Sequence, residues 1–185
     1  MVKPKIKKID ANSNKPWLTY KSKNIFVNLH FNHLMKESIK IVKISKNDKI
    51  LDFGCGYGEL KNRLKSFNVI GYDKRKELSD IKNYKNLRPD IIFCLAVFEY
   101  FSRNELISLI KEFKRMNKKS KLVVSMPTEN LFSKLGNLLF GFKSVNNEVK
   151  CDYKIVREVL SHNMILEKEK KLFPRTNDIT LWRFK

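Results

Sequence analysis

The sequence predicts an α/β domain built on an open, mostly parallel sheet with helices on both faces. The first observation is that residues 49–58 read KILDFGCGYG, a short apolar run with an acid near its end, followed by three glycines. Residues 59–64 then have helical character, so the segment is typical of a strand, a tight turn and a helix. Glycine permits positive φ angles and lets the backbone approach a ligand closely. In an open α/β sheet such a turn lies at the carboxyl end of a strand, where ligands bind.

Two later segments add strands of the same kind. Residues 69–73 read VIGYD and end on Asp73, 19 positions after Gly54. A carboxylate at the tip of a second strand can accept hydrogen bonds from both ribose hydroxyls of a nucleotide-like ligand. Residues 90–101 read DIIFCLAVFEYF, a longer apolar run that begins with an acid. A dinucleotide-binding fingerprint would need a further glycine at position 59, where this chain has Glu59.

In this order, the three segments resemble the motifs of the class I S-adenosylmethionine (SAM) dependent methyltransferases. Asp52 stands two residues before the first glycine, as the acid of the family's first motif does. The resemblance covers about residues 26–184 and implies a single-domain Rossmann-like methyltransferase fold. Its sheet would be seven-stranded and mostly parallel, closed by a C-terminal antiparallel hairpin. The resemblance also implies SAM as the cofactor and methyl transfer as the reaction.

The same resemblance assigns the residues that contact SAM. The turn at Gly54 and Gly56 would meet the methionine end, with Asp52 orienting the turn. Asp73 would hold the ribose, and Asp80 would flank the adenine unless it only caps a turn. The full set of predicted cofactor-binding residues is Asp52, Gly54, Cys55, Gly56, Asp73, Lys74, Asp80, Ile81 and Leu95.

The elements follow in order along the chain. Residues 1–16 form a basic lead-in that we expect to be flexible, which leaves residues 17–185 as the methyltransferase domain. Apolar residues recur every three or four positions over residues 26–42, which predicts a helix before the first strand. After Asp73 the chain is unusually brief, and residues 78–81 are interpreted as a short third strand.

The second half of the chain predicts two more helices and three strands. Ser102 and Glu105 have the spacing of a capping box, so a helix is expected to begin there. Residues 121–126 form a strand that Pro127 should stop, and residues 151–162 contain another helix. Residues 165–173 and 179–184 are read as the two strands of the closing hairpin.

Catalysis in this family depends mainly on aligning the acceptor with the methyl group, so proximity and orientation supply much of the rate. A base is needed only when the acceptor must lose a proton that water cannot take. Many relatives carry a histidine after the glutamate that follows strand four, whereas this chain has Tyr100 there. Glu99 and Tyr100 are therefore the catalytic candidates. A structural role for Glu99 in holding the loop stays open.

The loop signatures of two other substrate classes are missing. Enzymes that methylate exocyclic amines of bases carry an Asn/Asp-Pro-Pro-aromatic loop, whereas residues 95–98 read LAVF. Cys94 lies within the predicted strand and is read as a core residue, not as the nucleophile of a carbon-5 pyrimidine enzyme.

Residues 126–142 resemble small relatives that act on lipid or saccharide intermediates, because a Pro-Thr pair precedes an apolar helix. The plainest role expected for that helix is packing over the sheet. The alternative is an apolar lid over the acceptor or a contact with a membrane surface. We predict that residues 131–142 line the acceptor pocket together with Phe98, Glu99 and Tyr100.

Composition limits the partners and the compartment. The chain has 39 Lys and Arg against 19 Asp and Glu, a net charge of +20. This excess fits nucleic acid or an anionic surface, but the lysines are dispersed and match the codon usage of an AT-rich genome. Three separated cysteines and three scattered histidines (residues 30, 33 and 162) indicate neither a disulfide framework nor a metal site. The lack of a disulfide framework favours a reduced cytoplasm, and no apolar run reaches the roughly 18 residues of a membrane span.

The sequence therefore predicts a cytoplasmic SAM-dependent methyltransferase with a small-molecule acceptor, such as a lipid or saccharide intermediate. One alternative is an RNA methyltransferase that uses the basic surface. The other is a SAM-binding partner protein without catalysis.

Overall fold

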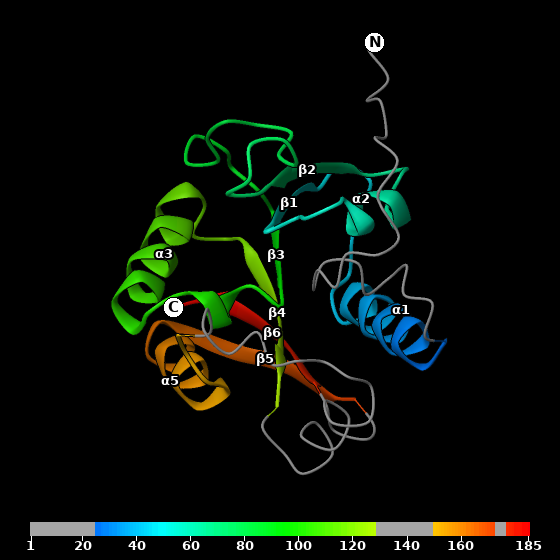
Figure 1. Cartoon of the computed structure of the whole chain (residues 1–185). Coiled ribbons are helices and arrows are strands. Elements are labelled where there is room, and N and C mark those ends of the chain that lie inside the picture. Colours follow the sequence, from blue (N-terminus) through cyan, green and yellow to red (C-terminus); the bar gives the residue numbers. More distant parts are fainter. Residues whose placement is uncertain (1–24, 129–149, 173–176) are drawn as a thin grey trace.

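The computed structural model describes residues 25–128, 150–172 and 177–185; for Phe26 and Val27 it describes the backbone alone. The basic lead-in at residues 1–16 and the apolar segment at residues 131–142 lie outside these ranges. The described chain forms one mixed sheet between two helical layers, as Figure 1 shows nearly edge-on.

The sheet has six strands in the order β2-β1-β3-β4-β6-β5. The first four run parallel, and β6 and β5 complete the sheet as an antiparallel pair. The predicted α/β class and its closing hairpin are therefore confirmed. The strands are β1 (Lys49–Phe53), β2 (Asn68–Tyr72), β3 (Ile91–Leu95), β4 (Lys121–Pro127), β5 (Met164–Lys171) and β6 (Asn177–Phe184).

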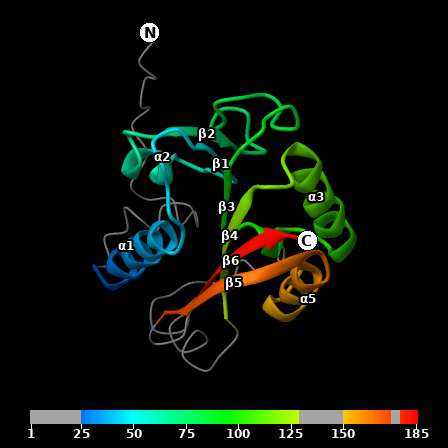
Figure 2. The same cartoon turned by 180° about the vertical axis from the view of Figure 1, so that it is seen from behind.

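The helices lie on both faces of the sheet, as predicted. One face is covered by α1 (Ile25–Lys40) and α2 (Glu59–Arg63), and the other by α3 (Arg103–Met116) and α5 (Tyr153–Asn163), as both views show (Figures 1 and 2). The short 3-10 helix η2 (Phe98–Tyr100) follows β3. The predicted capping box is present at α3, where the Ser102 side chain and the Glu105 backbone and side chain bond reciprocally.

Side chains that alternate along each strand divide the interior into two apolar cores. Leu51 and Ile92 belong to the core beneath α3 and α5. Ile50 and Phe93 point to the other side and join the core beneath α1 and α2. Because the central parallel strands are covered on both faces, they read as nearly continuous apolar runs.

The predicted third strand at residues 78–81 is wrong, because the described chain has no strand there and the sheet has six strands instead of seven. Two side chains replace it along the outer edge of β2. Gly71 N donates to Asp80 Oδ2 (2.7 Å), and Asp80 N donates back to Gly71 O (3.0 Å). Asp73 N donates to Ser79 Oγ (3.2 Å). A single Ser-Asp pair therefore satisfies edge groups that a neighbouring strand would otherwise bind.

Candidate cofactor and active site

The glycine turn joins the carboxyl end of β1 to α2. Gly54, Gly56 and Gly58 have φ angles of 80°, 50° and 75°, a region that residues with a Cβ rarely adopt. The turn is fastened to β2, since the backbone N–H groups of Gly54 and Cys55 both donate to Tyr72 O (2.7 and 3.0 Å).

The space around this turn differs from one glycine to the next. A Cβ on Gly54 would lie 2.4 Å from Val97 Cγ2, so Gly54 is required by packing against the loop after β3. A Cβ on Gly56 or Gly58 would meet no atom within 4 Å. The outer part of the turn thus presents bare backbone to open space, which suits close approach of a ligand.

Asp73 follows β2 and crosses over to the glycine turn. Its side chain is only 7% exposed; Oδ2 accepts a hydrogen bond from Gly56 N (3.0 Å), and Oδ1 accepts from Arg75 N (2.9 Å) and Arg75 Nε (3.2 Å). Burial alone would raise the pKa of Asp73, but the hydrogen bonds from Arg75 and Gly56 outweigh it and lower the pKa. An ionised carboxylate therefore stands beside the turn, as the predicted ribose contact requires.

Asp52 lies within β1 and is 4% exposed. Burial, with a smaller contribution from the carboxylates of Asp80 and Asp73, raises its pKa to about 7. Burial and the same three acids raise the pKa of Cys55 to about 12, so this residue is a neutral thiol in the turn. Three acids thus gather below the glycine turn of a chain whose net charge is strongly positive.

The Asp80 carboxylate already accepts hydrogen bonds at the edge of the sheet. Its Oδ2 accepts from Gly71 N and from Lys61 Nζ (2.8 Å), which agrees with the capping role that the sequence left open. Ile81 packs half-buried against the core beneath α3, and Lys74 is exposed. Contact of Asp80 and Ile81 with adenine stays a prediction.

Glu99 lies in η2, four residues after Leu95, and is 8% exposed. Its Oε2 has no hydrogen-bond partner within the described chain. Burial raises the pKa of Glu99 to about 7, although a hydrogen bond with Tyr100 opposes the rise. The loop is held by the Glu99 backbone instead, because Glu99 O accepts from Lys150 N (2.7 Å) and Cys151 N (3.2 Å). A catalytic role and a structural role for the Glu99 carboxyl both stay predictions.

Sequence reasoning missed two features at the same edge of the sheet. Ala96, directly after Leu95, has a φ of 54°, a strained backbone of the kind that clusters at functional sites. An alanine gives no sequence signal of this. Asp178 lies in β6 with one buried carboxylate oxygen that has no hydrogen-bond partner within the described chain, and an acid just before the predicted strand at residues 179–184 carries no signal of this. Cys94, by contrast, is fully buried in the core as predicted.

Within the part of the chain that the structure describes, no group of three or more His, Cys, Asp and Glu side chains could hold a metal ion. Over the same residues, no helix is long and apolar enough to cross a membrane.

Several solved structures share this fold. A protein from Pyrococcus horikoshii OT3 has a TM-score of 0.68 at 16% identity, covering 91% of this chain and 96% of its own. Magnesium protoporphyrin IX methyltransferase from Synechocystis PCC 6803, solved with bound SAH, has a TM-score of 0.62 at 13% identity, and 89% of each chain is covered. A mycolic acid cyclopropane synthase, solved with SAH and CTAB, has a TM-score of 0.61 at 14% identity, covering 87% of this chain and 72% of its own.

A search of curated proteins finds no match to this chain. The sequence profile of a family described as "Methyltransferase domain" matches residues 29–171, which is most of the chain. That range holds the glycine turn, Asp73 and Glu99, the main residues of the candidate site. The chain therefore belongs to this family and is a class I SAM-dependent methyltransferase.

Proposed function

We propose that this methyltransferase transfers the methyl group of SAM to a small-molecule acceptor with an apolar portion, such as a lipid or saccharide intermediate. The observation that carries the proposal is the environment of Glu99. Glu99 is only 8% exposed, and Val97 and Phe98, which precede it in the chain, are buried as well. Two of the structural neighbours carry small molecules in their names, magnesium protoporphyrin IX and mycolic acid.

The distribution of charge supports the same choice over RNA. Among the described residues, many lysines and arginines are paired with acids on several different elements. Lys61 on α2 pairs with Asp80, Lys121 on β4 with Glu167, and Lys170 on β5 with Glu37. Dispersed ion pairs do not build the continuous basic stripe that phosphate backbones require.

The residues present fit SAM. Gly56 and Gly58 leave open space over bare backbone, and the carboxyl groups of Asp52, Asp73 and Asp80 lie close to that turn. When bound, SAM supplies a methyl group already activated on a sulfonium. The carboxylates attract its positive charges, and Asp73 offers acceptors for ribose hydroxyls.

Glu99 would act as the general base that takes a proton from the acceptor. A carboxyl with a pKa of about 7 is ionised in a useful fraction near neutral pH and can accept a proton from a nearby acceptor atom. Its unpartnered Oε2 is the atom available for that contact. Tyr100, which hydrogen-bonds the same carboxyl, would orient it.

The test is transfer of label from methyl-labelled SAM to separated RNA and small-molecule fractions of cell extract over a salt series. We expect label in the small-molecule fraction with little dependence on salt. RNA binding through phosphates would make incorporation fall steeply with salt, because each phosphate contact releases counterions. Labelled RNA with that dependence would contradict the proposal.

Two variants separate the role of Glu99 from general damage. Glu99→Gln keeps the shape of the side chain and the hydrogen bonds of the residue 99 carbonyl, but its amide cannot accept the proton. We expect a loss of transfer of roughly 10²-fold or more with unchanged SAM affinity. Glu77→Gln alters an exposed glutamate and is the matched control.

A further inference from the structure

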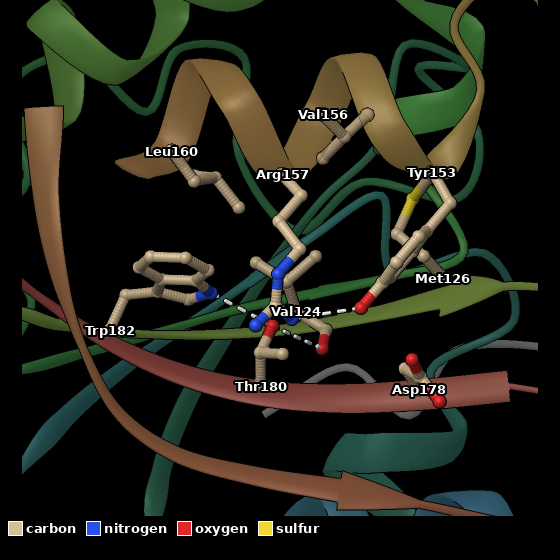
Figure 3. A pocket seen from close by; sticks show the side chains of 9 residues that line it. All are labelled: Val124, Met126, Tyr153, Val156, Arg157, Leu160, Asp178, Thr180 and Trp182. Atoms are coloured by element: carbon tan, nitrogen blue, oxygen red, sulfur yellow. Dashed lines mark hydrogen bonds between the residues drawn. The ribbon is translucent and has the colours of Figure 1, made fainter. Parts of the chain in front are cut away.

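A second polar site lies between α5 and the antiparallel part of the sheet. Figure 3 shows the pocket, whose floor is formed by β4 and β6 and whose roof is the helix. Its free space is about 10 Å³, close to what one water molecule needs. The lining residues are Val124, Met126, Tyr153, Val156, Arg157, Leu160, Asp178, Thr180 and Trp182.

Asp178 is the unusual member of this pocket. Its side chain is 3% exposed, and its Oδ1 has no hydrogen-bond partner in the described chain. A buried carboxylate oxygen without a donor is costly, so native structures rarely keep one without a purpose. The orphaned oxygen therefore indicates a donor that the described residues do not supply.

The other polar groups of the pocket already have partners. Arg157 Nη1 donates to Tyr153 Oη (2.8 Å) and to Glu169 Oε1 (2.5 Å), so its charge is shared with Glu169. Burial, together with hydrogen bonding to Asp178, raises the pKa of Tyr153 to about 12 and keeps its hydroxyl protonated. Among the lining residues Asp178 is the one acid and Arg157 the one base, and the Arg157 guanidinium is already bound by Glu169 from outside the lining.

Trp182 and Thr180 complete the lining without offering Asp178 a donor. Trp182 Nε1 donates to Thr180 Oγ1 (2.8 Å), and Thr180 Oγ1 in turn lies 3.4 Å from Val124 O. Both bonds are drawn in Figure 3. The pocket thus combines apolar side chains and polar groups that already have partners with one acceptor atom, Asp178 Oδ1, that has none within the described chain.

The register of the sheet places this pocket beside the methyl-transfer edge. Met126 is paired with Asp178, one position beyond Ser125, which pairs with Leu95 on β3. From the other side, Glu99 O binds Cys151 N, two residues before Tyr153. The predicted SAM contacts lie on β1, β2 and β3, so the pocket on β4 and β6 occupies the side from which an acceptor would approach.

We propose that this pocket receives a hydrogen-bond-donating group of the methyl acceptor, a hydroxyl or an ammonium, and that Asp178 determines that specificity. The inference rests on the proposed function and narrows it to acceptors that carry such a donor at one end. The space admits only the head of the group, so the rest of the acceptor would extend toward Glu99. Asp178 acts here as a binding residue and takes no part in the transfer itself.

Trp182 provides a direct readout, because its indole N–H lies in the pocket. The chain has two tryptophans, so the test uses the Trp17→Phe protein, which leaves Trp182 as the one indole. Methylammonium, methanol and acetonitrile are titrated while the ¹⁵N–¹H indole resonance is followed. Acetonitrile is similar in size but has no hydrogen to donate. We expect saturable shifts with one or both donors and none with acetonitrile.

Variants then identify the contact. Asp178→Asn keeps an acceptor oxygen but removes the charge, so methylammonium should bind about tenfold more weakly or worse, while methanol should change little. Asp178→Ala should abolish binding of both. Asp48→Asn, near the amino edge of the sheet, is the control and should behave as the parent protein does. Thermal unfolding of each variant checks that it folds.

The outcomes that overturn the inference are distinct from those that overturn the proposed function. An indole that does not respond to any donor, in protein that still binds SAM by calorimetry, removes this pocket from the acceptor site. Equal shifts in the Asp178→Ala protein would do the same, because the donors would then bind without the Asp178 carboxylate. Loss of SAM binding in the parent protein would instead refute the proposed function.

Discussion

At the scale of single residues, the environment of each carboxyl group separates its role from that of its neighbours. Asp73 is ionised because three hydrogen bonds outweigh its burial, whereas burial dominates at Asp52 and also at Glu99, where a hydrogen bond with Tyr100 only partly opposes it. Asp73 is therefore suited to accept hydrogen bonds from hydroxyl groups. Asp52 and Glu99 are suited to gain or lose a proton close to neutral pH.

The role of Asp73 gives the first prediction. Asp73→Ala removes an ionised acceptor that also fastens Gly56 N, so SAM affinity should fall about tenfold or more. Isothermal calorimetry with SAM and with S-adenosylhomocysteine measures this, and Asp48→Asn is the control. Unchanged affinity in folded protein would show that Asp73 does not hold the cofactor.

The raised pKa values of Asp52 and Glu99 predict how stability depends on pH. Both acids titrate near pH 7 in the folded protein but near pH 4 when unfolded, so the folded state holds more protons between these limits. The free energy of unfolding should therefore decrease as pH rises from about 4 to about 7, as far as these two groups determine it. Acids whose pKa is lowered in the folded protein, such as Asp73, change the free energy of unfolding only below this pH window.

Urea unfolding across the window measures the effect. Asp52→Asn and Glu99→Gln each remove one titrating group and should each flatten the decline. Curves of both variants that run parallel to the parent curve would contradict the assignment of these groups.

At the scale of elements, the glycine turn shows two different reasons for a glycine. Gly54 needs a positive φ and has Val97 against it, whereas Gly56 needs the positive φ alone. Gly56→Ala should cost about 1–2 kcal/mol of stability from its backbone. Gly54→Ala should cost more than that, because a Cβ 2.4 Å from Val97 forces the turn and the loop apart.

Measuring both the free energy of unfolding and the SAM affinity distinguishes the roles of Gly54 and Gly56 further. Val97→Ala should recover part of the loss in the Gly54→Ala protein, since it removes the clashing methyl groups. Gly56→Ala should weaken SAM binding in protein that still folds, because its methyl enters the open space over the turn. SAM affinity that is equal in the parent and the Gly56→Ala protein would show that the cofactor does not approach this backbone.

The edge of β2 is a second element with two candidate roles, and Asp80 can be tested for both. Asp80→Asn still offers an oxygen to Gly71 N, and the lost ion pair with Lys61 is exposed and worth less than about 1 kcal/mol. Asp80→Ala also removes the cap of the strand. If Asp80 only caps, SAM affinity should survive the Asn change and stability should fall in the Ala protein. Loss of SAM affinity in the Asn protein would indicate a contact with the cofactor.

At the scale of the whole molecule, the sequence predicted the class of fold and the parallel core well. The reason is that strand, turn and capping signals are local: the KILDF run, the alternate glycines and the Ser102–Glu105 pair each determine their own element. The antiparallel pair of β5 and β6 could also be predicted, although residues 173–176 between them lie outside the described chain. Predicted boundaries differ from the observed ones by a few residues, as at Lys40, where α1 ends before the predicted residue 42.

The failures have a different physical origin. The third strand was inferred from position in the chain, but an edge is satisfied by any donor and acceptor in reach, and here Ser79 and Asp80 supply them. The pocket around Asp178 joins residues from β4, α5 and β6, so its polarity exists only after folding. The ordinary sequence signals at these positions describe a strand and a helix and carry no information about an unpaired oxygen.

The brief connection after Asp73 also bears on which cofactor analogues this enzyme would accept. Where a further strand and helix would wall in the far end of a bound nucleoside, this chain has only a short loop with exposed side chains at Lys82 and Asn83. We expect bulky substituents on the N6 amine of adenine to be tolerated here, while changes at the ribose are rejected by Asp73. Competition of N6-benzyl-S-adenosylhomocysteine and 2′-deoxy-S-adenosylhomocysteine against SAM would measure this contrast. An enzyme with that tolerance could be supplied with a tagged methyl donor that more enclosed methyltransferases refuse.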